Sequence, residues 1–348
     1  MKRSIKLLTA AAALSAGLVA SAGVPTPASA QTKILVHIFA PATYPNNLGW
    51  NWLKENVERD TEGRVVFEFT PGAVAPPARN WDHVTSGLVD AAYIHAGFER
   101  NRLHLMDIGR LTGHNPSATA LGVASWRTYK KHFEAAGEYK GTKLLATYTY
   151  TGEQIFTIDK PINSVADIKG LKLRSGNGLA KDIFVDLGAA AIPSLATEIF
   201  PMVSKGVVDG MTGSAALAAV LKVDQFLNYG VEYPGAFVSL IWTPILNIQK
   251  WESISADDQA IMDKYLGEAL TRNVSGRWDE GNVNALAKMR ANGVKIHPTS
   301  PEMTAEVKQI TAKYTDQWLE KAANRGVDGK AALAYFNEQL KAVQAEKK

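Results

Sequence analysis

The sequence predicts an α/β protein with two lobes, a ligand cleft between them and a long helix that spans both. Segments of strand character alternate with amphipathic helical segments, first over residues 32–97 and again over 170–213, which is typical of two α/β units. A later β-like segment, 235–251, is suited to return the chain to the first unit. The helical pattern from Ala256 to Arg290 would measure about 50 Å if unbroken. That length suits a helix that braces two lobes.

The first unit alternates strands and helices. Val65, Phe67 and Phe69 recur at every second position, as in a strand, whereas apolar residues between 46 and 62 recur at spacings of three and four, as on one face of a helix. This order predicts a parallel or mixed sheet with helices on its faces. The expected strands and helices are, in turn, 32–39, 46–62, 64–73, 78–88 and 89–97.

The rest of the chain repeats this order after a helix expected over 117–136 and strand segments expected over 143–159. Gly276 and Gly281 are positions at which the long helix could kink or break. The second unit is expected to contain the strands and helices 170–174, 178–188, 190–193, 195–206 and 207–213, and two amphipathic helices, 301–323 and 329–345, close the chain.

These elements predict a division into lobes. Ligands in such folds bind where strand ends and helix starts face the gap between the lobes. The expected parts are a signal peptide at 1–30, lobe 1 at 31–153 with roughly 240–280 returning to it, lobe 2 at 154–239 with roughly 281–323, and a C-terminal helix at 324–348.

The N-terminus has the pattern of a secretory signal. A charged start, a short apolar, alanine-rich run and small residues at Ala28 and Ala30 predict export and cleavage near Ala30. The apolar run is short for a membrane span, although an uncleaved N-terminal anchor is the alternative. We expect a mature periplasmic chain of 318 residues without stable membrane insertion.

Charge and cysteine content exclude several functions. The chain has 38 basic and 34 acidic residues, and three of the basic ones, Lys2, Arg3 and Lys6, lie in the predicted signal. The mature chain is therefore close to neutral, which argues against a nucleic-acid partner. Cysteine is absent, so thiol nucleophiles, zinc–thiolate sites and iron–sulfur clusters are excluded.

The common motifs of catalysis are also missing. No serine lies in Gly-x-Ser-x-Gly or has a lysine three residues on, and the seven histidines are scattered without metal-ligand spacing. The segment Gly176-Asn177-Gly178 lacks the lysine of a phosphate-binding loop, and we interpret it as a turn before a helix. The sequence therefore predicts neither a metal nor a cofactor.

Arg174 is the candidate that suggests binding chemistry. It ends the strand segment "GLKLR", next to a glycine-flanked turn and a helix start. A guanidinium offers paired donors that match the two oxygens of a carboxylate, and a nearby helix N-terminus favours the same charge. A surface arginine or a structural salt bridge is the alternative.

Several segments resemble one family of proteins. "INSVADIKGLKLRSG", "LGAAAIP", "TEIFPMVSKGVVDG" and "LNIQKWESISADDQAIM" are similar to the solute-binding proteins of TRAP transporters, the DctP type, and "KILVHIFAP" and "VTSGLVDAAY" agree with its opening. The resemblance implies a two-lobed, periplasmic-binding-protein-like fold that closes on an organic anion. It places Arg174 at the ligand carboxylate and implies a membrane permease driven by an ion gradient as partner.

Three positions depart from the family pattern. Gln154 stands where some members have a second arginine, Gly213 where many have a ligand-contacting asparagine, and Phe200 where a tyrosine is usual. Each change gives a smaller or more apolar side chain, which favours a monocarboxylate with an apolar or aromatic body. The candidate ligand-binding residues are Arg174, Gln154, Tyr44, Phe98, His95, Met211, Gly213 and Trp242.

The sequence thus predicts an extracytoplasmic solute-binding protein that delivers a small carboxylate to a TRAP-type secondary transporter. An exported, hydrolase-like enzyme on the same frame is one alternative, and the missing catalytic motifs argue against it. A sensory ligand-binding subunit is the other alternative.

Overall fold

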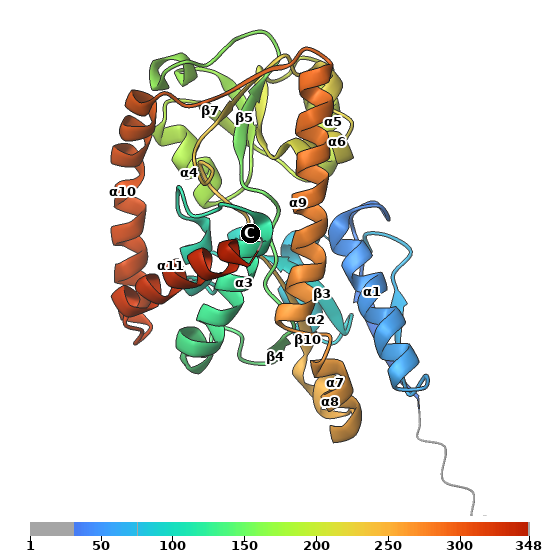
Figure 1. Cartoon of the computed structure of the whole chain (residues 1–348). Coiled ribbons are helices and arrows are strands. Elements are labelled where there is room, and N and C mark those ends of the chain that lie inside the picture. Colours follow the sequence, from blue (N-terminus) through green and yellow to red (C-terminus); the bar gives the residue numbers. More distant parts are fainter. Residues whose placement is uncertain (1–30, 75, 347–348) are drawn as a thin grey trace, which may run out of the picture. The chain divides into compact units, whose positions relative to one another are not determined.

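The structure is a computed structural model, and it describes residues 31–74 and 76–346. The predicted signal peptide lies outside the described residues. The described chain contains two β-sheets with helices packed on them (Figure 1), and this confirms the predicted α/β class.

The first sheet is mixed and has the strand order β2-β1-β3-β10-β4. The strands β1, β2 and β3 are parallel, and β10 pairs antiparallel with both β3 and β4. The late strand β10 therefore returns the chain to the first sheet, as predicted from its β-like sequence. The strands are β1 (Thr32–His37), β2 (Val65–Phe69), β3 (Ala91–His95), β4 (Thr142–Leu144) and β10 (Trp242–Asn247).

The second sheet has the order β11-β9-β5-β8-β6-β7. Three pairs of strands in it are parallel, β6 with β7, β6 with β8 and β11 with β9, whereas β5 runs antiparallel to β8 and β9. The strands are β5 (Gln154–Thr157), β6 (Lys172–Ser175), β7 (Ala190–Pro193), β8 (Gly210–Gly213), β9 (Tyr229–Glu232) and β11 (Lys295–Pro298).

The helices cover the faces of the sheets. The helix α1, for example, buries Leu53 and Val57 in the same apolar cluster as Ile34 and Val36 of β1. The helices are α1 (Pro45–Asp60), α2 (Asn80–Thr85), α3 (Ala118–Thr128), α4 (Leu179–Asp186), α5 (Ala196–Ser204), α6 (Ala215–Val220), α7 (Ile248–Glu252), α8 (Ala256–Asp263), α9 (Glu268–Ala291), α10 (Pro301–Asn324) and α11 (Gly329–Ala345).

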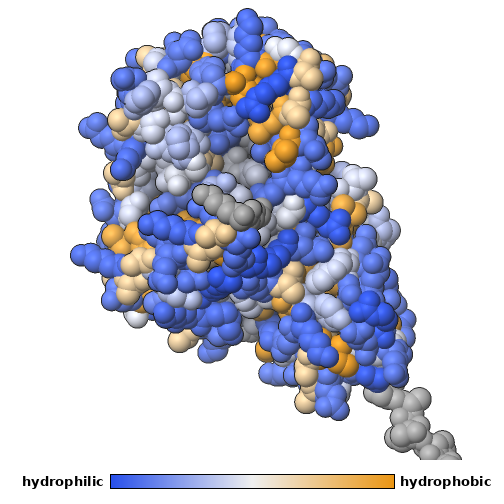
Figure 2. All heavy atoms as spheres, viewed as in Figure 1, coloured by the Kyte–Doolittle hydropathy of each residue, from blue (hydrophilic) through white to orange (hydrophobic). Residues whose placement is uncertain are grey.

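The surface is mainly hydrophilic on the face shown in Figure 2, with scattered apolar residues. This agrees with helices that bury one apolar stripe and expose the rest. The large hydrophobic residues exposed in the described chain are Val74, Leu88, Val185, Leu195, Phe200, Val207 and Val283.

The long helix is α9, and it spans both lobes. It packs against α1 and α3 beside the first sheet and against α6 beside the second, and Figure 1 shows it running past both. The prediction of one helix over 256–290 was wrong, because α8 and α9 are separate. Gly267 between them has φ +59°, and a Cβ there would lie 2.7 Å from the Trp126 ring. Gly276 and Gly281 lie inside α9 and do not break it.

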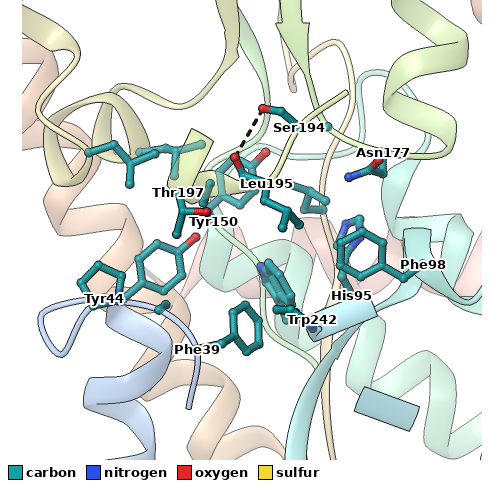
Figure 3. Close-up of a pocket in the computed structure, with 18 of the residues that line it drawn as sticks. Phe39, Tyr44, His95, Phe98, Tyr150, Asn177, Ser194, Leu195, Thr197 and Trp242 are labelled. Atoms are coloured by element: carbon teal, nitrogen blue, oxygen red, sulfur yellow. Dashed lines mark hydrogen bonds between the residues drawn. The ribbon is translucent and has the colours of Figure 1, made fainter. Parts of the chain in front are cut away.

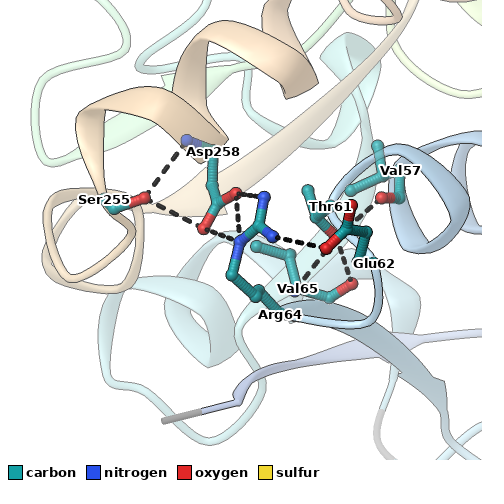
Figure 4. Close-up of polar contacts among 7 residues, drawn as sticks. All are labelled: Val57, Thr61, Glu62, Arg64, Val65, Ser255 and Asp258. Carbon is teal, nitrogen blue, oxygen red and sulfur yellow. Dashed lines mark hydrogen bonds and ion pairs between the residues drawn. The ribbon is translucent and has the colours of Figure 1, made fainter. Parts of the chain in front are cut away.

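The helix α8 is held against the turn between α1 and β2 (Figure 4). Arg64 of this turn donates from Nε and Nη2 to one carboxylate oxygen of Asp258, at 3.0 and 2.9 Å. Asp258 also accepts from the hydroxyl of Ser255, the N-cap of α8, at 2.9 Å. The break at Gly267 therefore lets α8 turn towards this contact instead of extending α9.

Three other predicted elements are shorter than expected. The helix predicted over 78–88 is a 3₁₀ turn at Pro77–Arg79 followed by α2, and the helix predicted from residue 117 ends its α-helical part at Thr128 and continues as a π-helical turn. The strand segment predicted over 143–152 pairs only at β4 and at an isolated bridge between Tyr148 and Trp242, because this stretch leads from the first sheet to the second.

A glycine in α1 makes the close approach of α1 and α9 possible. A Cβ on Gly49 would lie 2.2 Å from Cγ2 of Val274 in α9. Alanine would gain up to about 1 kcal/mol of helix propensity, but overpacking costs about 1–3 kcal/mol. We expect Gly49→Ala to lower the free energy of unfolding, measured by urea denaturation.

The matched control is Gly276→Ala in α9, where the nearest atom to a new Cβ is 4.0 Å away. Only the difference in helix propensity between glycine and alanine acts there, so the free energy of unfolding of this variant should rise by about 0.5–1 kcal/mol. A Gly49→Ala protein as stable as the control would contradict the packing argument.

Candidate functional site

A cavity of about 270 Å³ lies between the two lobes, with walls from both. Figure 3 shows Tyr44, Phe39, Trp242 and His95 on one side of the cavity and Ser194, Leu195 and Thr197 on the other. The first group belongs to segments next to β1, β3 and β10, and the second follows β7. Strand ends and helix starts thus meet at the cavity, as α/β folds arrange their ligand sites.

Arg174 lies in the wall formed by the second lobe. It is on β6, beside Ile192 of β7, and only 5% of it is exposed. Its Nε donates to the Ser194 hydroxyl at 3.1 Å, and its Nη2 donates to the Ser194 carbonyl at 2.6 Å. Within residues 31–74 and 76–346, the buried Nη1 has no hydrogen-bond partner. The guanidinium is therefore oriented by two bonds while one nitrogen is left to bind something else.

The N-terminus of α5 adds to this wall. Ser194, Leu195, Ala196 and Thr197 line the cavity next to Arg174. The first N–H groups of a helix lack intrahelical partners and carry partial positive charge, so this terminus favours an anion. From the sequence we expected the helix start after Gly178 in this role. Gly176 and Asn177 do line the cavity. The helix predicted over 195–206 is α5, and its start at the cavity is a role that we did not predict.

Glu153 is the buried charge that the sequence analysis missed. Its side chain is fully buried and accepts hydrogen bonds from the Tyr150 hydroxyl, at 2.8 Å, and from the Thr212 hydroxyl. A Cβ on Gly176 would lie 2.6 Å from Oε1 of Glu153, so only glycine leaves room for this carboxylate. Burial lowers the pKa of the Arg174 guanidinium, and the negative charge of Glu153 opposes that shift.

Gln154 is not part of the cavity wall. Its amide nitrogen donates to the Tyr233 carbonyl at 3.1 Å, and its amide oxygen accepts from the Tyr233 N–H at 2.7 Å. Consecutive residues of an extended chain point to opposite faces. Glu153 therefore faces towards Arg174 while Gln154 faces away from it, into a separate pocket.

Met211 and Gly213 are also absent from the cavity wall. Both are on β8, which lies between β5 and β6 in the middle of the second sheet. Met211 is fully buried in the apolar core, and a Cβ on Gly213 would lie 2.8 Å from its methyl carbon. The structure brings together five of the eight candidates, namely Arg174, Tyr44, His95, Phe98 and Trp242.

The wall from the first lobe is mainly aromatic. The His95 ring centroid lies 5.0 Å from that of Trp242 and 5.1 Å from that of Phe98, and the Phe39 and Trp242 centroids are 6.4 Å apart. Burial strongly lowers the pKa of His95, and Arg110 and Arg174 lower it further. The imidazole is therefore neutral near pH 7.

Tyr44 completes this wall close to Arg174. Burial raises the pKa of its phenol, and the positive charge of Arg174 opposes the shift. The phenol therefore keeps its proton and can donate a hydrogen bond. Together, a cation, a helix start and an aromatic wall can hold an anion with an apolar body.

No group of three His, Asp or Glu side chains in the described parts of the chain is placed to hold a metal ion. In the same residues, no helix combines the length and the apolar character needed to cross a bilayer.

Comparison with known proteins identifies the family. The family described as bacterial extracellular solute-binding protein, family 7, or DctP, matches residues 36–322. The chain belongs to the DctP family. This confirms the resemblance found in the sequence, and the DctP family is a family of solute-binding proteins, not of enzymes.

Relatives and solved structures agree with this assignment. An outer membrane transporter protein, TsaT, of Comamonas testosteroni is 26% identical over 94% of this chain and 97% of its own. A TRAP periplasmic solute-binding protein of Bordetella bronchiseptica, solved with bound (R)- and (S)-mandelate, is 28% identical with a TM-score of 0.85, over 89% of this chain and 99% of its own. A TRAP solute-binding protein of Rhodoferax ferrireducens shares the fold with a TM-score of 0.81 at 21% identity, over 91% of this chain and 99% of its own.

Proposed function

We propose that this DctP-family protein binds a monocarboxylate with an apolar or aromatic body and delivers it to a TRAP-type membrane permease. The observation that carries the proposal is the buried guanidinium of Arg174, which is oriented by Ser194 and whose Nη1 has no partner in the described chain. An anion that pairs with this nitrogen would satisfy it.

The carboxylate would bind between Arg174 and the start of α5. Arg174 carries a positive charge and the start of α5 a partial positive charge, and both line the cavity, where protein walls replace much of the surrounding water. Attraction between the guanidinium and the carboxylate is stronger in this lower dielectric. The phenol of Tyr44 is a further donor near the same position.

The body of the ligand would pack on the aromatic wall of Phe39, Phe98 and Trp242. Ligand cavities of this size are lined mainly by apolar and aromatic side chains. The Bordetella bronchiseptica protein with bound mandelate supports an aromatic acid. A periplasmic protein of Nostoc, 24% identical over 88% of this chain and 82% of its own, is named as a monocarboxylate 2-oxoacid-binding protein.

A second carboxylate would be disfavoured. Glu153 already places one buried negative charge beside Arg174, and Gln154 faces away from the cavity. Desolvating a second carboxylate without a counter-charge costs several kcal/mol. Sialate-like and C4-dicarboxylate ligands therefore suit this site less well than a monoacid.

The remaining parts of the proposal concern export and the lobes. We propose that residues 1–30 are removed near Ala30 and that the mature protein acts in the periplasm. We further propose the lobe boundaries given above, with 31–153 and roughly 240–280 in the first lobe and 154–239 and roughly 281–323 in the second. The strands assigned to the two sheets support these boundaries.

A thermal-shift screen against organic acids tests the ligand class. A binding protein gains stability from any ligand that binds only the folded state. We expect aromatic and aliphatic monoacids to raise the melting temperature and to be recovered chemically unchanged. Succinate and sialate should give no shift. A large shift with succinate or sialate, with all monoacids inert, would reject the proposed class, and conversion of an acid during incubation would indicate an enzyme.

The role of Arg174 is tested by substitution. Arg174→Ala would leave the bound carboxylate without its cation, and we expect a loss of about 2–5 kcal/mol, or roughly 30- to 5,000-fold in affinity. Arg174→Lys keeps the positive charge but loses the paired N–H donors of the guanidinium, so its affinity should lie between that of the alanine variant and that of the wild-type protein. Calorimetric titration with a monoacid from the screen gives the three values.

The matched control is Arg277→Ala, an exposed arginine of α9 that donates a hydrogen bond to Asn273 on the same helix. It should keep wild-type affinity. Melting curves without ligand separate binding from stability, and a folded Arg174→Ala protein with wild-type affinity would contradict the carboxylate role.

A further inference from the structure

The cavity has a second polar position on the wall opposite Arg174. His95 ends β3, Trp242 begins β10, and the two residues are register partners on these antiparallel strands. Directly opposed residues of such a pair point to the same face of the sheet. Figure 3 shows both rings side by side in the cavity wall. Their position is therefore set by the sheet and not by a loop.

Each of these rings has one nitrogen without a partner. His95 is 3% exposed and Trp242 9% exposed. Neither Nε2 of His95 nor Nε1 of Trp242 finds a hydrogen-bond partner in the part of the chain that the structure describes. Most buried polar groups of native proteins are paired, and an unpaired one is destabilising. Two such groups, adjacent in the wall of a ligand cavity, are explained if the ligand supplies the missing partner.

The chemistry of the two nitrogens limits what that partner can be. An indole N–H is only a donor, whereas the neutral imidazole of His95 offers either a donor or an acceptor at Nε2, depending on its tautomer. Neither group carries a charge that would compensate a second anion. A hydroxyl or ketone oxygen can accept from Trp242 and also pair with His95. The neighbouring residues Phe39, Phe98 and Leu240 are apolar, and Tyr44, the polar side chain placed above in the same wall, lies close to Arg174, where the carboxylate is proposed to bind.

We infer that His95 and Trp242 together bind one uncharged oxygen on the body of the ligand, so that the ligand is a hydroxy- or oxo-substituted apolar monocarboxylate. This inference rests on the proposed function and makes its ligand class narrower. Arg174 lies in the second lobe and the His95–Trp242 pair in the first. One ligand molecule therefore joins the two lobes through two polar contacts, with its apolar part between them.

The test compares acids that differ by a single oxygen. Calorimetric titration of the wild-type protein uses two pairs, mandelate with phenylacetate and 3-hydroxybenzoate with benzoate. We expect the hydroxylated member of at least one pair to bind about tenfold more tightly, as one buried hydrogen bond provides. The ratio within a pair is informative because a general loosening of the cavity weakens both members.

Two variants locate the effect at the inferred position. Trp242→Phe and His95→Phe each keep an aromatic ring and remove the nitrogens, and each should reduce the preference within the pair to about twofold or less. The control is Phe39→Leu, which changes the same wall without changing a polar atom and should weaken both members of a pair alike. Melting curves without ligand show which variants are folded.

The possible failures are distinguishable. Equal binding of both members of each pair by the wild-type protein would overturn the inference and leave the proposed function intact. The same conclusion follows if the preference survives unchanged in both variants. If no acid binds at all, the proposed function and the inference fall together. The wild-type comparison needs no variant, so it decides the question even if a substitution prevents folding.

Discussion

The site depends on how Ser194 holds Arg174. Arg174 is only 5% exposed, so its guanidinium loses most of its hydration, and a buried cation is unfavourable unless hydrogen bonds and counter-charges replace the water. Ser194 accepts from Nε and Nη2, and Glu153 supplies a nearby negative charge. These contacts fix the plane of the guanidinium and leave Nη1 as the donor at the cavity. The interaction thus orients the cation and keeps it incompletely satisfied until an anion binds.

The rest of the fold keeps these groups in place. The strands β6 and β7 run parallel, so their carboxyl ends meet at one edge, where Arg174 and Ser194 become neighbours and α5 begins. The helix α9 packs on helices of both lobes, so the two walls of the cavity are linked by one helix. The segments that lead the chain from one sheet to the other, together with α9, determine how the aromatic wall at the ends of β3 and β10 faces Arg174 on β6.

Local patterns in the sequence were sufficient for the parts of the site that lie at strand ends. Arg174, His95 and Trp242 were named as candidates because they lie near the ends of predicted strands, and strand ends face the cleft in α/β folds. The break at Gly267 could not be predicted in the same way. Gly267 has φ +59° and lies against the Trp126 ring, which belongs to a helix distant in the sequence, so a side chain would not fit there. A helical pattern alone does not report such long-range contacts.

The missed and misplaced residues have physical reasons in the alternation, order and pairing of strands. Side chains of an extended segment alternate between the two faces of the sheet. An error of one residue in a choice made from the sequence therefore selects a side chain on the wrong face. We chose Gln154, and the residue that faces Arg174 is Glu153. Met211 and Gly213 are on a central strand whose burial depends on the strand order, and the start of α5 became part of the site only through the pairing of β6 with β7.

The most direct test of this account is a crystal structure of the protein grown with mandelate. The account predicts electron density for the ligand in the cavity, with a carboxylate oxygen within about 3.2 Å of Nη1 of Arg174 and the ring against Phe39 and Trp242. A ligand bound outside this cavity would contradict the account. So would a carboxylate that points to the aromatic wall while Nη1 of Arg174 is paired with a protein group.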